Sequence, residues 1–299
     1  MAELSDRTRR NAGDAYQLDR SAGRLQVLEH HARDPMVKVQ SLTFRYPNGT
    51  TVFEGFDWHV ERGQVWAVIG SSGCGKTTLL MLLAGLLRPS AGQVWVDNKP
   101  LSRPRPRTGL ILQDYGLLPW ATVWRNAALG LDIRAFYGPD GIHAPADENL
   151  EDRDERVAYW LKRLGINHLA QRYPHQISGG QRQRTAIART LALRPDLLLM
   201  DEPFGALDAP TRQDLQQLTL QLCQEQNLTA VIVTHNIEEA LYVGQHVLVL
   251  GQPPQRTARV VQSPRTSTVD WEETRRSSEM QRLVEELTDL IGDEGHEMA

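Results

Sequence analysis

The chain has 299 residues and a mass of 33.7 kDa, enough for one large domain or two small ones with a substantial core. Apolar residues make up 40%, charged residues 23%, and the net charge is −4, so neither general disorder nor a broad nucleic-acid-binding surface is indicated. Two distant cysteines, Cys74 and Cys223, suit neither a disulfide framework nor a zinc site, which points to a reducing cytoplasm. The longest apolar stretch, 79–87, is too short to span a membrane, and the N-terminus is unlike a signal peptide.

The N-terminal part divides near Met36. Residues 1–35 carry six basic and six acidic side chains with few large apolar ones, which predicts a mobile or weakly helical extension. The main domain is expected over 36–265. In it, apolar residues alternate with polar ones on both sides of a Pro-Asn-Gly turn at 47–49, which predicts an antiparallel β subdomain.

A compact apolar run at 65–69 predicts a strand buried on both faces. It leads through a glycine-rich loop into a helical stretch at 77–87. Further buried strands are expected at 110–112, 197–200, 230–233 and 247–250, with helical segments between several of them. Alternating strands and helices predict an α/β fold with a mostly parallel core sheet.

The block from 120 to 173 contains no good strand, and its apolar residues recur at helical spacing between Val157 and Leu164. We therefore expect an inserted α-helical subdomain over about 120–180. Its stretch 140–156 has seven acids against two arginines and is expected to be a solvated surface loop. At the C-terminus, 266–299 should form an acidic amphipathic helix that docks on the domain, with partner binding as the alternative.

The strongest motif is a loop that fits G-x-x-x-x-G-K-[ST] and follows the strand at 65–69. It consists of Gly70, Ser71, Ser72, Gly73, Cys74, Gly75, Lys76 and Thr77, and Thr78 extends it. Glycines allow successive backbone N–H groups to surround phosphate oxygens, and the following helix adds its positive end. Lys76 is expected to neutralise the β- and γ-phosphates, and the Thr77 hydroxyl to bind Mg²⁺. The loop predicts a nucleoside triphosphate site.

Two adjacent carboxylates, Asp201 and Glu202, follow the apolar strand at 197–200. Ligands of open α/β sheets bind at this end of the strands. Asp201 would hold Mg²⁺ through its water shell, and Glu202 would orient the water that attacks the γ-phosphate. Alone, such a pair is as often a polar strand end. With the glycine loop, it indicates nucleoside triphosphate hydrolysis.

A second glycine motif reads Ile-Ser-Gly-Gly-Gln-Arg-Gln-Arg from Ile177 onward. Ser178, Gly179, Gly180 and Gln181 open a helix whose N–H groups can bind an anion, although in isolation they would be read as a helix cap. The segment resembles the signature of the ATP-binding cassette, the ATPase subunit of ABC transporters. The resemblance implies that it closes over ATP held by a second ABC ATPase subunit, identical or related, so that hydrolysis requires a dimer.

Four further residues fall where this family places functional groups: Tyr46, Gln113, Asp208 and His235. The resemblance implies that Tyr46 stacks on adenine, that Gln113 contacts Mg²⁺ and water, and that His235 hydrogen-bonds the γ-phosphate. It also implies that Asp208 lies in the loop that couples the two sites of a dimer. Each residue alone would be an ordinary strand, loop or strand-end residue.

The segment from Gln113 to Trp120 is similar to that of the importer group for nitrate, sulfonate, taurine and bicarbonate. This resemblance implies an Mg-ATP-hydrolysing subunit on the cytoplasmic face of the cell membrane, beneath two separate transmembrane permease subunits. A periplasmic or extracellular solute-binding protein would act indirectly, and no nucleic acid is implied. Leu117, Leu118 and Trp120 would line a groove for a permease helix or pack inside the helical subdomain. The alternative is a non-transport ABC ATPase, for example one serving iron–sulfur assembly.

Overall fold

The structure is a computed structural model that describes residues 16–19, 24–27, 35–264 and 275–292. Its strands are β1 (Tyr16–Asp19), β2 (Arg24–Val27), β3 (Val37–Arg45), β4 (Thr51–Val60), β5 (Val65–Gly70), β6 (Ala91–Val96), β7 (Lys99–Pro100), β8 (Thr108–Ile111), β9 (Leu197–Asp201), β10 (Thr229–Val233), β11 (His246–Leu250) and β12 (Arg259–Gln262). Its helices are α1 (Lys76–Leu83), α2 (Val123–Tyr137), α3 (Arg153–Arg163), α4 (Gly179–Leu191), α5 (Ala209–Glu225), α6 (Ile237–Val243) and α8 (Ser278–Gly292), with the 3₁₀ helices η1 (Asn167–Leu169) and η2 (Pro174–Gln176).

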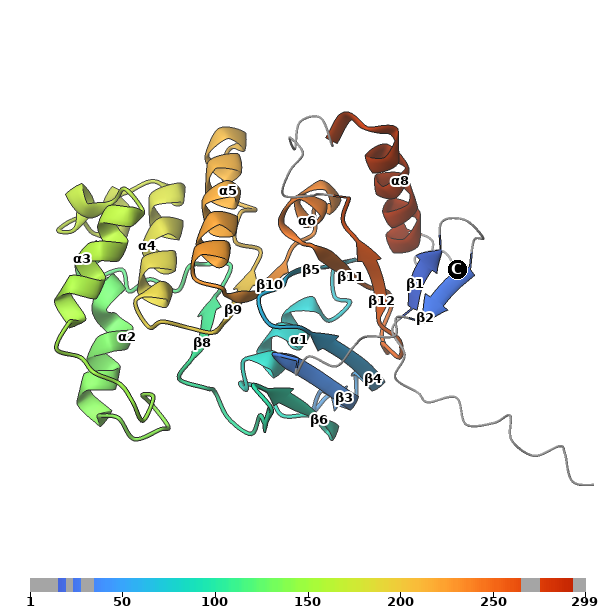
Figure 1. The fold of residues 1–299 in the computed structure, drawn as a ribbon, viewed down its shortest axis with the longest axis horizontal. Coiled ribbons are helices and arrows are strands. Elements are labelled where there is room, and N and C mark those ends of the chain that lie inside the picture. The colour runs from blue at the N-terminus through green and yellow to red at the C-terminus, as the bar shows by residue number, and fades with distance from the viewer. Residues whose placement is uncertain (1–15, 20–23, 28–34, 265–274, 293–299) are drawn as a thin grey trace, which may run out of the picture.

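The larger sheet has the strand order β2-β1-β12-β11-β5-β10-β9-β8, and the five strands from β11 to β8 run parallel (Figure 1). Along β5, Val65, Ala67 and Ile69 enter one hydrophobic cluster, whereas Trp66 and Val68 enter the other. Both faces are therefore covered, which is the reason these strands read as continuous apolar runs. The expected α/β fold is confirmed, and the carboxyl ends of β5, β8, β9 and β10 lie at one edge.

The smaller sheet is antiparallel, in the order β4-β3-β6-β7, and confirms the expected N-terminal β subdomain. Helix α1 lies between the two sheets and shares their apolar cluster (Figure 1). Strand β6 was not expected, although Val94 and Val96 are buried on either side of the partly exposed Trp95. That alternation is a strand signal which the sequence already contained.

Helices α2, α3 and α4 form the helical subdomain at one end of the molecule, and α8 lies at the other (Figure 1). The block from 120 to 173 contains no strand in the described chain, as expected. Helix α8 packs against α6 and β11 through the buried side chains of Met280, Leu283 and Leu287. Its expected docking on the domain is confirmed.

Helix α1 ends earlier than the expected 77–87. Gly85 has a φ of 73°, and the N–H groups of Leu86 and Leu87 both bond to the carbonyl oxygen of Met81. This is a glycine C-terminal cap, which satisfies the last carbonyl groups while the chain turns away. The apolar run 79–87 therefore extends four residues beyond the end of α1 at Leu83.

The expected mobile or weakly helical extension is wrong in part. Strands β1 and β2 pair with each other, and β1 pairs in parallel with β12. The rest of that extension lies outside the described residues. The short sequences YQLD and RLQV alternate apolar and polar residues and find an open sheet edge in β12.

The stretch 140–156 is not simply a solvated loop. The Glu148 carboxylate is only 6% exposed and is paired with Arg134 and Arg156, which are equally buried. Arg134 also donates to the carbonyl oxygens of Leu193 and Pro106, because its guanidinium has donors to spare. The expectation fails here because the acid run is anchored by an arginine from α2 that no local pattern reveals.

Both cysteine side chains are buried, Cys74 in the glycine loop and Cys223 in α5. Burial raises the pKa of the Cys223 thiol to about 12. Within the described residues, no helix is both long and apolar enough to cross a lipid bilayer.

Candidate functional site: a phosphate-binding loop and three sheet-edge side chains

The glycine loop follows β5 and opens α1, and at two of its positions neighbouring atoms leave no room for a Cβ. Gly70 has a φ of 155°, and a Cβ added there would lie 2.4 Å from the carbonyl oxygen of Leu250. Gly75 has a φ of 112°, and an added Cβ would lie 2.5 Å from the Val52 side chain. The loop is therefore wedged between β11 and the antiparallel sheet, with its backbone close to both.

Lys76 lies in the centre of this loop with its residue only 8% exposed. Its Nζ donates to the carbonyl oxygens of Gly70 and Ser71, each at 2.9 Å. In the described part of the chain no carboxylate forms an ion pair with it. A buried ammonium without a counter-ion is costly, so the loop is suited to an anion. The α1 N-cap, Gly75, contributes no side-chain cap, which leaves first-turn N–H groups for the same anion.

Thr77 and Asp201 meet beside this loop. The Thr77 hydroxyl donates to the Asp201 carboxylate at 2.9 Å, and Asp201, at the end of β9, is 6% exposed. Burial raises the pKa of the Asp201 carboxyl, whereas the bond from Thr77 acts in the opposite direction. A hydroxyl beside a carboxylate is the oxygen donor set that Mg²⁺ takes together with substrate phosphates.

Glu202, Gln113 and His235 converge from the ends of three neighbouring strands. The Glu202 carboxylate lies 3.4 Å from Gln113 Nε2 and 3.2 Å from His235 Nδ1. Glu202 has a φ of 45°, and its N–H donates to the Val233 carbonyl oxygen at 2.9 Å. A left-handed glutamate is strained backbone of the kind found at functional sites, and here it turns the carboxylate toward the other two groups.

Tyr46 lies in the turn after β3, at the margin of the loop. Its hydroxyl is 2.8 Å from the Thr78 hydroxyl, and its ring meets Phe44 edge to face at 4.9 Å. The residue is 36% exposed. The ring is therefore held by α1 at one end while part of it stays open to a ligand.

The second glycine motif is a capped helix start. Ser178 and Gln181 exchange hydrogen bonds at 3.3 and 2.9 Å, forming a capping box at α4. A Cβ added at Gly180 would lie 2.5 Å from the methyl group of Thr211, so α4 packs tightly on the first turn of α5. Asp208 caps α5 by accepting the Thr211 N–H at 3.1 Å, which lowers the pKa of the Asp208 carboxyl.

These predicted residues therefore form two groups. Among the described residues, no hydrogen bond or ion pair links Ser178, Gly179, Gly180 or Asp208 to the loop at 70–77. The loop group contains the anion cradle, the oxygen donors and the Glu202 cluster. The α4–α5 group presents a separate helix terminus.

The segment between Gln113 and α2 is tied to the helical subdomain by two residues that sequence reasoning missed. Asn126, fully buried, accepts the Leu118 N–H at 2.7 Å and donates to nearby carbonyl groups. Arg189 of α4 donates to the carbonyl oxygens of Tyr115 and Gly116, and burial lowers its pKa. Nothing in the residue types signals either contact, because each is defined only by tertiary packing.

The three apolar residues of this segment differ in burial. Trp120 is 74% exposed, whereas Leu117 and Leu118 are partly buried, with Leu117 packed on the helical core. Trp120 thus stands out from a firmly anchored loop. Of the three expected groove residues, Trp120 is therefore the one most exposed at the surface.

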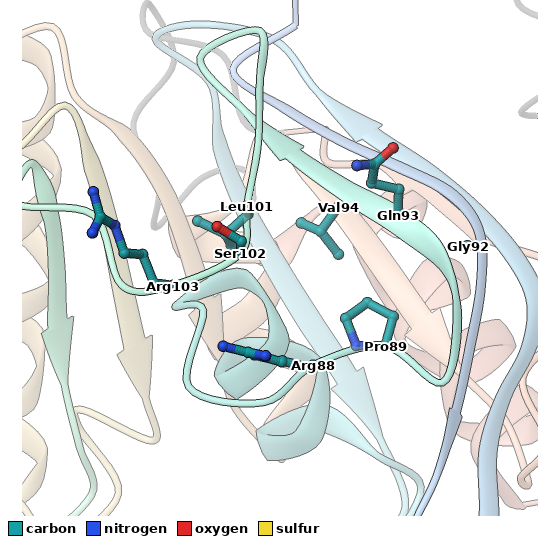
Figure 2. Close-up of a pocket in the computed structure, with 8 residues that line it drawn as sticks. All are labelled: Arg88, Pro89, Gly92, Gln93, Val94, Leu101, Ser102 and Arg103. Carbon is teal, nitrogen blue, oxygen red and sulfur yellow. The ribbon is translucent and has the colours of Figure 1, made fainter.

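A separate cavity of about 320 Å³ lies between the α1–β6 connection and the segment after β7, and Figure 2 shows the residues that line it. It is lined by Arg88, Pro89, Gly92, Gln93, Val94, Leu101, Ser102 and Arg103. None of the predicted site residues lines it. It is therefore distinct from the phosphate-binding loop.

The parallel sheet, the loop before α1 and the carboxylates after β9 together define a P-loop nucleotide-binding protein. Residues 53–205 match the ABC transporter family ABC_tran, and the chain belongs to this family. The expected ATP-binding cassette is confirmed. The cassettes of this family are ATPases, so the expected enzyme class, an ATPase, is confirmed by membership of the family.

Several similar relatives are named for nitrate or bicarbonate transport. The chain is 44% identical over 66% of its length to the nitrate import ATP-binding protein NrtC, and 40% over 73% to the bicarbonate transport ATP-binding protein CmpC, both of Synechococcus elongatus. It spans 28% and 32% of these two proteins. It is 36% identical over 75% of its length to the nitrate transport protein NasD of Klebsiella oxytoca, of which it covers 83%. The expected similarity to this importer group is confirmed.

Among solved structures, the chain is similar to the ATP-binding cassette MJ0796, described as a dimer in a post-hydrolysis state bound to ADP and Pi. The TM-score is 0.65 at 29% identity, and the match covers 77% of this chain and all of that one. This neighbour confirms the cassette fold.

Proposed function

We propose that the chain is the ATP-hydrolysing subunit of an ABC importer for a small oxyanion such as nitrate or bicarbonate. Support for the ATPase comes from the geometry of the loop and of the Glu202 cluster. Support for the substrate class comes from the names of NrtC, CmpC and NasD alone. Sulfonate and taurine remain members of the same expected class.

In this proposal the loop group holds Mg-ATP. The backbone N–H groups of residues 70–77, continued by Thr78, surround the phosphates, and Lys76 moves from carbonyl oxygens to phosphate oxygens. Thr77, Asp201 and Gln113 hold Mg²⁺, which when bound supplies positive charge beside the phosphate oxygens. Tyr46 offers its ring to the adenine.

Glu202 orients and polarises the attacking water, because its carboxylate is turned toward the edge where β5, β8, β9 and β10 end. Gln113 and His235 contact that carboxylate and complete the cluster, with His235 donating to the γ-phosphate. The bond between the water oxygen and the γ-phosphorus forms as the bond to ADP breaks. The convergence of these three side chains is the single observation that carries the proposal.

The α4–α5 group acts on a second cassette. Since Ser178, Gly179, Gly180, Gln181 and Asp208 do not reach the chain's own loop, they are free to face nucleotide held by another subunit, identical or related. The neighbour MJ0796 is dimeric with ADP and Pi bound. ATP-dependent closure of such a dimer would drive the transport cycle.

The exposed Trp120, on the anchored segment after Gln113, is the proposed contact for a permease helix. Under this proposal the chain lies on the cytoplasmic face of the membrane beneath two transmembrane subunits, with a solute-binding protein acting from outside. A tilt of the anchored segment would displace Gln113, whose Nε2 lies 3.4 Å from the Glu202 carboxylate.

Two measurements test these claims separately. In Glu202→Gln, ATP binding should persist, turnover should fall by roughly 100-fold or more, and an ATP-bound dimer should accumulate; the exposed Glu225→Gln is the matched control. Turnover at the wild-type rate would exclude the assigned role of Glu202. Separately, capture of the tagged chain from gently solubilised membranes should recover two multi-span permeases, whereas only cytosolic partners would exclude the importer.

A further inference from the structure

The turn that carries His235 is held by a buried hydrogen-bond network that the site above does not use. Glu239, in the first turn of α6, is 7% exposed and lies four residues after His235. Its carboxylate accepts a hydrogen bond from Gln216 Nε2 of α5 at 3.0 Å, and the side chain of Thr234 also acts on this carboxylate. One buried carboxylate thus joins α5 to the residue immediately before His235.

The same network continues through the turn. The Thr234 hydroxyl accepts the N–H of Asn236 at 3.1 Å, and the Asn236 side chain accepts the N–H of Glu239 at 2.8 Å. The N–H of Thr234 bonds to the Val68 carbonyl oxygen at 3.1 Å. The His235 side chain itself is 64% exposed. The position of its imidazole therefore depends on the backbone on either side of it.

Helix α5 provides the fixed end of this network. Its first turn is pressed against α4 at Thr211, and Gln216 is 7% exposed. A cavity of about 190 Å³ lies between α5 and α6, and Gln216 and Glu239 both line it. Beside this space, the hydrogen bond from Gln216 to Glu239 joins the two helices. Burial raises the pKa of the Glu239 carboxyl, and the bonds from Thr234 and Gln216 oppose that shift.

We propose that Glu239 is a positioning residue, which fixes the Thr234–Asn236 turn to α5 and so aims His235 at the reacting phosphate. The inference rests on the proposed function, in which His235 contacts the γ-phosphate. It adds a residue that does not touch substrate. A displacement of about 1 Å at such a contact is enough to slow a reaction by roughly 100-fold.

The test is a double-substitution cycle on the full chain, with ATP turnover measured at saturating and limiting Mg-ATP. Glu239→Ala should lower kcat by roughly 10- to 100-fold and change KM for ATP by less than about threefold. In a His235→Ala background the same substitution should cost nothing further, because Glu239 acts through His235. Glu239→Gln, which can still hydrogen-bond both partners, should recover much of kcat. The neighbouring Glu238→Gln, on an exposed ion pair with Arg275, should behave like wild type.

Three results would overturn the inference. A kcat of Glu239→Ala close to wild type would show that the turn holds without the carboxylate. Equal losses in the wild-type and His235→Ala backgrounds would show a general structural effect. A wild-type kcat for His235→Ala would remove the proposed role of His235 itself, which is a failure of the proposed function and is seen in the single variant. Should Glu239→Ala not fold, the cycle is run with Gln216→Ala, which cuts the same network from the α5 side.

Discussion

The glycine loop at 70–77 and the acidic segment at 140–156 both hold a buried charge, yet they do so in opposite ways. Lys76 is buried against carbonyl oxygens and forms no ion pair with a described carboxylate, with Asp201 acting on it only at longer range, so its charge is left for a ligand. Glu148 is buried between two arginines, so its charge is neutralised by ion pairs within the fold. An uncompensated buried charge indicates binding, whereas a compensated one indicates architecture.

The largest expected loss of stability is at Glu148. Glu148→Gln leaves the buried Arg134 without a described negative partner, whereas Arg156 keeps its ion pair with Asp152, and breaking a buried pair costs about 3–5 kcal/mol. We expect the urea midpoint of the helical subdomain to fall accordingly, while nucleotide still binds to the folded protein. The control is Asp147→Asn, because Asp147 is 75% exposed and, among the described residues, pairs only with Arg107 at the surface. Equal midpoints for the two variants would contradict the compensated-charge interpretation.

Lys76→Ala tests the other region and should give the opposite pattern. ATP affinity should fall by roughly 30-fold or more, since truncating one partner of a buried charge pair costs about 2 kcal/mol or more. The unliganded fold should lose less stability than in Glu148→Gln, because removing the ammonium relieves a buried charge while also removing its hydrogen bonds to the Gly70 and Ser71 carbonyl oxygens. Equilibrium nucleotide binding and urea unfolding without nucleotide check the two halves. A strongly destabilised unliganded variant would show that Lys76 is architectural.

The smallest expected effect is on the acid side of the stability profile. The close contact with Arg156, an ion pair at 2.7 Å, lowers the pKa of the Asp152 carboxyl, so the ionised form is favoured in the folded state. That contribution is complete above the unfolded pKa of about 3.9 and is lost as the pH falls through the folded pKa. The effect is modest because Asp152 is 36% exposed. Urea midpoints measured between about pH 5 and pH 3 should fall less steeply in Asp152→Asn than in wild type; identical slopes would contradict this assignment.

The sequence predicted those parts of the site that depend on a short run of neighbouring residues. The strand at β5, the loop ending in Lys76 and Thr77, and Asp201 after β9 each follow from a short run of residue types. The meeting of Gln113, Glu202 and His235 also follows, since parallel strands end at one edge. The roles of the individual residues stay predictions until the variants are measured.

What escaped prediction depends on contacts between distant segments. Glu148 reads as one more acid in a charged run, because its partner Arg134 lies on α2, fourteen residues earlier. Glu239 sits in an ordinary helix start and becomes notable only beside Gln216 of α5. Strand β6 is different, because its alternation of apolar and polar residues could have been recognised in the sequence. The early end of α1 could also have been predicted, because Gly85 follows directly after a helical run.

The burial of both thiols has a practical consequence for watching the molecule at work. Reaction with maleimide-type reagents needs an accessible thiolate, and neither Cys74 nor Cys223 offers one, with the pKa of Cys223 raised to about 12. A single cysteine placed at Phe136, which is 82% exposed at the end of α2, would therefore be labelled selectively in the otherwise unaltered chain. The helical subdomain could then carry a fluorescent or spin probe while the phosphate loop keeps its native cysteine.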